Sequence, residues 1–213
     1  MLVGIRRKIK FKIMLKVGLT GSIAVGKSFV CEVLRELGAF VLDADLTARE
    51  VVAPNTVGLQ KIVENFGAEI LQPNGELDRV KLGAIVFGDE PKRQLLNSIV
   101  HPLVIESQND WLAETERENP SAIAVIDAAL MIESGGYERF TKLIVVWCQP
   151  AIQLERLMLR NNLSESEALK RINSQMPQDE KKRYADFLID TSEGFEATRL
   201  KTTEVFRELE LLT

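Results

Sequence analysis

The chain has 213 residues, of which 46% are hydrophobic and 27% are charged. This length and composition are typical of one globular domain with a substantial buried core. The net charge of −4 argues against a general nucleic-acid binder, and no window approaches the roughly 20 apolar residues of a membrane span. The two cysteines, Cys31 and Cys148, lack metal-ligand spacing, so we expect a reduced protein that works in the cytoplasm.

Residues 1–14 form a basic extension that carries five Lys or Arg residues and no acid. It resembles the start of a signal peptide, but no uninterrupted apolar segment follows it. We expect this extension to be disordered or to precede the true start, for which Met14 is the candidate. A tail that binds a membrane or a nucleic acid is the alternative.

Short apolar segments alternate with helical patterns along the rest of the chain, which indicates an α/β protein with a mainly parallel sheet. Five segments are expected to be strands: residues 15–20, 39–43, 122–127, 142–148 and 184–190. Helices are expected at residues 27–37, 150–161 and 195–211, and a further helix should follow Ser164. Glu167, three residues after Ser164, completes a capping box for that helix.

Residues 45–118 break this alternation, because they contain no convincing strand and several helical stretches. The turn signals PNG at 73–75 and GDEP at 88–91 separate these stretches, and one of the predicted boundaries lies before the pair His101-Pro102. So long an insertion between two core strands predicts a helical subdomain that binds an acceptor substrate.

The stretch GSIAVGKS at 21–28 follows the first strand and matches the phosphate-loop pattern G-x-x-x-x-G-K-[ST]. In such a loop, backbone N–H groups and the positive end of the next helix form an anion site. Lys27 is expected to reach the β- and γ-phosphates, and the Ser28 hydroxyl is expected to bind Mg²⁺. ATP is the expected ligand of the loop residues Gly21, Ser22, Ile23, Ala24, Val25, Gly26, Lys27, Ser28 and Phe29. A dinucleotide-binding fold is a weak rival, because the G-x-G-x-x-G spacing is absent.

Further motifs lie at fixed places along the chain: VLDADLTAREVV (41–52), His101-Pro102, DAALMIE (127–133), QLERLMLR (153–160), RINSQMP (171–177) and YADFLID (184–190). Together with the phosphate loop, they resemble bacterial dephospho-coenzyme A kinases over residues 15–210. The resemblance implies ATP-dependent phosphorylation of the 3′-hydroxyl of the dephospho-CoA ribose. We also expect a monomer or weak homo-oligomer that binds neither nucleic acid nor a membrane.

The resemblance further implies a three-layer α/β/α phosphate-loop (P-loop) kinase fold with a five-stranded parallel sheet. On this basis residues 15–44, 121–150 and 184–213 would form the core, residues 45–120 the helical CoA-binding subdomain and residues 151–183 a lid. Some residues depart from the family pattern. Phe29 stands where a threonine is usual, Ala129 replaces a common proline, and Thr191 replaces asparagine. Phe29 removes a hydroxyl near the α-phosphate and is expected to alter nucleotide affinity. The other two departures put local loop geometry and the adenine contact in doubt, but not the reaction.

The residues of the expected site have both catalytic and structural interpretations. Asp45 is the candidate for activating the 3′-hydroxyl, although Asp also favours helix caps, so Asp45 is alternatively the cap of the next helix. Asp43, two residues earlier in an extended segment, is expected on the same side, where it supports the substrate site or the water shell of Mg²⁺. A solvated acid at the end of the strand is the alternative for Asp43. Arg160 resembles a lid arginine that neutralises transition-state charge, and Arg156, four residues earlier, is expected to bind ATP. An exposed helix face is the alternative for both arginines.

Three more residues complete the expected site. Asp127 ends a strand where phosphate-loop proteins carry a second metal-associated acid, so Mg²⁺ binding is expected, with a buried turn-forming role as the alternative. Arg49 lies one turn beyond Asp45 and is a candidate for acceptor binding. His101 precedes a proline and either fixes a turn or binds the acceptor, as the resemblance implies. Two rival functions stay open: another small-molecule kinase, such as a nucleoside monophosphate kinase, and a nucleotide switch, which the absence of [NT]-K-x-D disfavours.

Overall fold

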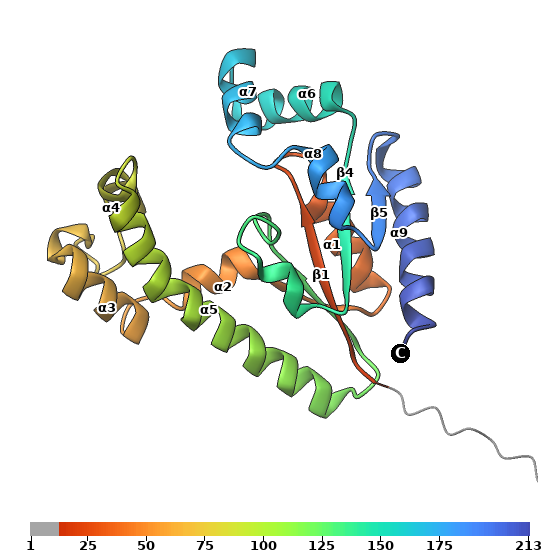
Figure 1. The fold of residues 1–213 in the computed structure, drawn as a ribbon, viewed down its shortest axis with the longest axis horizontal. Coiled ribbons are helices and arrows are strands. Elements are labelled where there is room, and N and C mark those ends of the chain that lie inside the picture. The colour runs from red at the N-terminus through yellow and green to blue at the C-terminus, as the bar shows by residue number, and fades with distance from the viewer. Residues whose placement is uncertain (1–12) are drawn as a thin grey trace, which may run out of the picture.

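A computed structural model describes residues 13–213, so the expectation for residues 1–12 lies outside the described residues. Five strands form one parallel sheet in the order β2-β3-β1-β4-β5 (Figure 1). The strands are β1 (Leu15–Gly21), β2 (Phe40–Asp43), β3 (Ile123–Asp127), β4 (Lys142–Trp147) and β5 (Phe187–Asp190). The predicted parallel α/β fold with five strands is therefore confirmed. Met14, placed in the extension by the sequence, is buried against the sheet.

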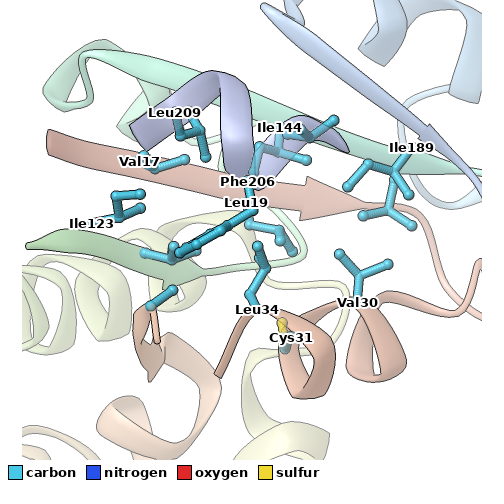
Figure 2. Close-up of a cluster of buried hydrophobic side chains, with 14 of the residues drawn as sticks. Val17, Leu19, Val30, Cys31, Leu34, Ile123, Ile144, Ile189, Phe206 and Leu209 are labelled. Carbon is cyan, nitrogen blue, oxygen red and sulfur yellow. The ribbon is translucent and has the colours of Figure 1, made fainter. Parts of the chain in front are cut away.

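Alternation along the strands places one set of apolar side chains on each face of the sheet. Val17 and Leu19 of β1 face helix α1 (Lys27–Glu36) and helix α9 (Gly194–Glu210) in one buried cluster (Figure 2). On the other face, Ala124 and Ile126 of β3 belong to a second cluster, which includes side chains of helix α5 (Glu90–Glu118). The sheet is therefore covered on both faces, as the three-layer prediction requires.

The remaining helices fall into two groups (Figure 1). Those between β2 and β3 are α2 (Ala44–Glu50), α3 (Val57–Phe66), α4 (Arg79–Val86) and α5 (Glu90–Glu118). Those between β4 and β5 are α6 (Pro150–Asn161), α7 (Glu165–Asn173) and α8 (Gln178–Lys181). Short 3₁₀ helices lie at Ala68–Ile70, Gly136–Arg139 and Lys182–Tyr184. Ser164 and Glu167 form the predicted capping box of α7.

The insertion between β2 and β3 has its own hydrophobic cluster, in which Ile62 and Ile70 are fully buried. Figure 1 shows α3 and α4 at the end of α5 that lies away from the sheet. The predicted break before the His101-Pro102 pair is wrong, because α5 runs through Pro102 without ending. The missing N–H of proline interrupts the helical hydrogen bonds, but packing of α5 against α2, α3 and α4 outweighs that loss. Within residues 13–213, no helix is long and apolar enough to cross a membrane.

Candidate active site

The phosphate loop joins β1 to α1 at the carboxyl edge of the sheet, where open α/β folds bind ligands. Two residues of the loop adopt left-handed backbone angles: Ala24 has φ 62° and Gly26 has φ 85°. A Cβ on Gly21 would lie 2.6 Å from the carbonyl oxygen of Val146, so only glycine permits this approach of the loop to β4. The loop therefore has the tight, backbone-lined form that a phosphate group requires.

A cavity of about 630 Å³ opens at the phosphate loop, a size that suits a small-molecule ligand. It brings together most of the residues that the sequence predicted. Its lining includes the loop residues Gly21–Phe29, Asp45 from α2, and Arg156 and Arg160 from α6. Asp43, Arg49, His101 and Asp127 are not among the lining residues.

Asp43, rather than Asp45, caps helix α2. The Asp43 side chain accepts hydrogen bonds from the backbone N–H groups of Asp45 (2.8 Å) and Leu46 (3.1 Å). The expectation that both aspartates point to the same side is therefore wrong, because Asp43 turns back onto the helix while Asp45 lies in its first turn. An N-cap residue is held by these bonds, so Asp43 fixes the backbone from which Asp45 reaches the cavity.

The pKa of Asp45 is raised, chiefly because the folded protein partly removes its carboxylate from water. The carboxylates of Asp43 and Asp127 raise the pKa further, while Lys27 and Arg49 oppose this shift. A raised pKa makes a carboxylate a better proton acceptor. These electrostatics suit a general base.

Lys27 forms an ion pair with Asp127 at the end of β3. The other carboxylate oxygen of Asp127 accepts a hydrogen bond from Cys31 Sγ at 3.3 Å. Asp127 is only 7% exposed, so its charge is compensated by the phosphate-loop lysine. This pairing was not anticipated from the sequence, which predicted Asp127 as a metal ligand. It gives the buried carboxylate a role in holding the lysine beside the loop.

Thr191, noted as a departure from the family pattern, links three elements. Its hydroxyl donates a hydrogen bond to the carbonyl oxygen of Val25 at 2.7 Å. Arg156 donates to the Thr191 hydroxyl oxygen at 2.9 Å and to its carbonyl oxygen at 2.8 Å. Thr191 therefore connects the end of β5 to the phosphate loop and holds Arg156 at the cavity.

The donor groups of the cavity match a phosphate and its metal ion. Ser22 Oγ is buried and has no hydrogen-bond partner among residues 13–213, so it is available to donate to a phosphate oxygen. In the same part of the chain, no group of three or more His, Cys, Asp or Glu residues is placed to hold a metal. Mg²⁺ in kinase sites takes only one or two protein oxygens and completes its shell with phosphates and water. The Ser28 hydroxyl and the Asp127 carboxylate fit that role.

The other predicted residues lie on the insertion side. Arg49 is exposed in the last turn of α2, and His101 is exposed in the middle of α5. The cavity also has lining residues that the sequence did not identify: Ala129, Gln175, Thr191, Gly194, Phe195 and Thr198. Phe195 packs edge-on against Phe29 with ring centroids 4.8 Å apart. Three of these positions had been noticed in the sequence for another reason: Gln175 lies in the motif RINSQMP, and Ala129 and Thr191 depart from the family pattern. The other three positions carried no recognisable motif.

Comparisons with known proteins settle the family. The family model described as dephospho-CoA kinase matches residues 15–196. The chain belongs to the dephospho-CoA kinase family. A dephospho-CoA kinase of Listeria monocytogenes is 45% identical over 86% of this chain and 91% of its own length. Another from Bacillus anthracis is 45% identical over 92% of this chain and 98% of its own length.

Solved structures agree with this membership of the dephospho-CoA kinase family. A crystal structure from Thermus thermophilus matches with a TM-score of 0.78 and 27% identity, over 92% of this chain and 98% of that one. The dephospho-CoA kinase from Campylobacter jejuni matches with a TM-score of 0.63 and 28% identity, over 92% and 97% of the two chains. The match therefore includes the sheet, the insertion between β2 and β3, and the α6–α7 segment.

Proposed function

We propose that this protein transfers the γ-phosphate of ATP to the 3′-hydroxyl of dephospho-CoA, giving coenzyme A and ADP. Membership of the dephospho-CoA kinase family supports this activity. The observation that carries it is the position of Asp45, which lines the same cavity as the phosphate loop. A carboxylate beside a phosphate site is the arrangement that a hydroxyl acceptor requires.

In the proposed reaction, an oxygen of the Asp45 carboxylate accepts the proton of the 3′-hydroxyl. The freed electron pair on that hydroxyl oxygen forms the bond to the γ-phosphorus, while the bond from this phosphorus to the β,γ-bridging oxygen breaks. ADP leaves with the electrons of the broken bond. The raised pKa of Asp45 assists the proton transfer, which general base catalysis accelerates by roughly 10²–10⁴.

Three cations are available for the charge of the transferring group. Lys27 lies in the phosphate loop, and Arg156 and Arg160 line the cavity from α6. Arg160 is exposed, and its Nε donates to the neighbouring Asn161 at 2.9 Å, whereas Arg156 is held by Thr191. We assign Arg156 to ATP binding and Arg160 to the transition state, because positioned cations are the main source of catalysis in phosphoryl transfer.

Ser28 and Asp127 are the proposed protein ligands for Mg²⁺, in direct contact or through water. When bound with ATP, Mg²⁺ supplies positive charge to the phosphate oxygens. Ser28 is exposed at the start of α1, and the Asp127 carboxylate also holds Lys27.

We propose that the helical insertion binds the acceptor through Arg49 and His101, that Asp43 supports this substrate site by capping α2, and that residues 151–183 act as a lid. Arg49 suits a phosphate or ribose group, and it lies in the same short helix as Asp45. Closure of a lid excludes water, which would otherwise compete with the acceptor for the γ-phosphate. We further propose that the enzyme works in the cytoplasm as a monomer or weak homo-oligomer, without nucleic-acid or membrane partners.

The experiment is ADP release from ATP-Mg²⁺ with a panel of acceptors. Dephospho-CoA should stimulate ADP release strongly, whereas AMP and other nucleoside monophosphates should not. Stimulation by a nucleoside monophosphate alone would favour another small-molecule kinase. Nucleotide binding without stimulation by any acceptor would favour a switch and overturn the proposed activity.

A further inference from the structure

A chain of four hydrogen bonds runs through the phosphate loop at Ile23. The backbone N–H of Cys148 donates to Gln178 Oε1 at 3.1 Å, and Gln178 Nε2 donates to Gln153 Oε1 at 2.7 Å. Gln153 Nε2 then donates to the carbonyl oxygen of Ile23 at 2.8 Å. The backbone N–H of Ile23 in turn donates to Gln175 Oε1 at 2.8 Å.

The orientation of each amide in this chain is determined by its neighbours. A backbone N–H can only donate and a backbone carbonyl can only accept, so Cys148 and Ile23 fix the direction of every bond between them. Bonds that point the same way polarise one another and become stronger. Gln153 is 2% exposed, so the bonds to its amide form away from competing water.

Both anchors of Ile23 lie at the base of the same helical hairpin. Gln153 is in the first turn of α6, and Gln175 follows the end of α7 by two residues. Figure 1 shows α6 and α7 as a pair beyond the edge of the sheet. The hairpin therefore holds one phosphate-loop residue at two points: Gln153 binds the carbonyl oxygen of Ile23, and Gln175 binds its N–H.

The segment that carries Gln175 is itself fixed to the protein core. Lys181 is fully buried, and its Nζ donates to the carbonyl oxygen of Ala129 at 2.9 Å and contacts Glu133 at 2.8 Å. Glu133 also accepts a hydrogen bond from the backbone N–H of Met176 at 3.3 Å. Gln175 therefore has a rigid support on its C-terminal side. We infer that its bond to Ile23 positions the phosphate loop, and not that the loop positions Gln175.

We propose that Gln153 and Gln175 are positioning residues for the nucleotide site. By holding both polar groups of Ile23, they set the curvature of the phosphate loop and leave the neighbouring N–H groups facing the cavity. Arg156 and Arg160 lie three and seven residues after Gln153 on α6, on the same face. The same anchor therefore aligns the loop with both arginines. This inference rests on the proposed use of ATP at the loop.

The test compares Gln175→Met with Gln149→Met. Methionine keeps the length of glutamine and removes its amide, and Gln175 is partly exposed, so the variant should fold. Gln149 is exposed at the start of α6 and makes no capping hydrogen bond with its side chain. We expect the Kd for ADP-Mg²⁺, measured by calorimetry, to rise about tenfold in Gln175→Met, as for loss of one partly buried hydrogen bond. Gln149→Met should stay within twofold of the parent.

A thermal melt separates positioning from general stability. If Gln175→Met melts at a lower temperature but binds ADP like the parent, its role is structural and the inference fails. Gln153→Met, measured in the same way, should also weaken ADP binding while the KM for dephospho-CoA changes less than twofold. Equal losses for ADP and dephospho-CoA would overturn the inference. Because ADP binding needs no acceptor, the Kd values for ADP-Mg²⁺ of both variants are independent of whether dephospho-CoA is the substrate.

Discussion

On the phosphate-loop side of the cleft, side chains from α6, β3 and the end of β5 hold Ile23, Lys27 and Val25 in place. On the insertion side, Arg49 and His101 lie exposed on α2 and α5, in an insertion that has its own hydrophobic cluster. The phosphate-loop side is therefore preorganised, whereas the insertion side, which we propose to bind the acceptor, presents exposed side chains. Substitutions on the two sides should change different kinetic constants.

The largest effect is expected at Asp45, which lies between the two sides. Asp45→Asn should lower kcat by roughly 10²–10⁴ and leave the Kd for ADP within about twofold. The control is Asp110→Asn, which changes an exposed acid on α5. Turnover near the parental value would remove Asp45 from the mechanism.

The same variant has a predicted effect on stability. Because the pKa of Asp45 is raised in the folded state, the folded protein binds the Asp45 proton more tightly than the unfolded chain does. The contribution of Asp45 to the free energy of unfolding is therefore highest at acidic pH, and it falls as the pH rises through the raised pKa. At pH 7, Asp45→Asn should have a Tm equal to or above that of the parent, and this difference should shrink in acid. A lower Tm at pH 7 would contradict the shift.

Arg49→Ala tests the insertion side alone. The KM for dephospho-CoA should rise about 10- to 100-fold, the effect of losing a hydrogen bond to a charged group, while the KM for ATP stays unchanged. Arg49 also lowers the pKa of Asp45, so its removal should move the acidic limb of the kcat profile to higher pH. Arg79→Ala, an exposed arginine on α4, is the control. An equal rise in the KM for ATP would contradict the separation of the two sides.

Thr191→Val tests the phosphate-loop side. The valine keeps the shape of threonine but cannot donate to Val25 or accept from Arg156. The KM for ATP should rise about tenfold, because a buried carbonyl loses its partner. Thr191→Ser keeps the hydroxyl and should remain near the parent. If the valine and serine variants have the same KM for ATP, the hydroxyl does not organise the loop.

The smallest effect is expected at Asp43. Asp43→Ala removes the cap of α2 and should lower the free energy of unfolding by about 1 kcal/mol, with a few-fold loss of kcat as Asp45 becomes less well held. Asp43→Asn retains a cap oxygen and should behave like the parent in denaturant unfolding and in turnover. An asparagine variant as impaired as the alanine variant would mean that the Asp43 charge acts on the substrate directly.

The sheet and the phosphate loop could be predicted from the sequence, because their signals are local. A buried parallel strand is a continuous apolar run, and Gly21, Lys27 and Ser28 have a fixed spacing within one loop. Asp45 could be placed because parallel strands end at the same edge of the sheet. These inferences need only the order of residues and the direction of the strands.

Other features depended on contacts between distant segments. The sequence alone gave no reason for α5 to continue through Pro102, since its packing partners are spread over residues 44–86. The Lys27–Asp127 pair joins residues that are 100 positions apart, and the bond from Thr191 to Val25 joins residues 166 apart. The sequence pattern could not decide which aspartate caps α2, because that depends on the exact residue at which β2 ends. The ends of helices and strands are uncertain by one or two residues.

The two cysteines have a consequence for the chemistry of the proposed substrate. Coenzyme A and its precursor carry a terminal thiol, which forms mixed disulfides with reactive protein cysteines by thiolate exchange. Cys31 and Cys148 are both buried, and burial is the main reason that the pKa of each thiol is raised. Neither side chain is therefore available as a thiolate. The folded enzyme should resist covalent capture by its own substrate and product during oxidative stress.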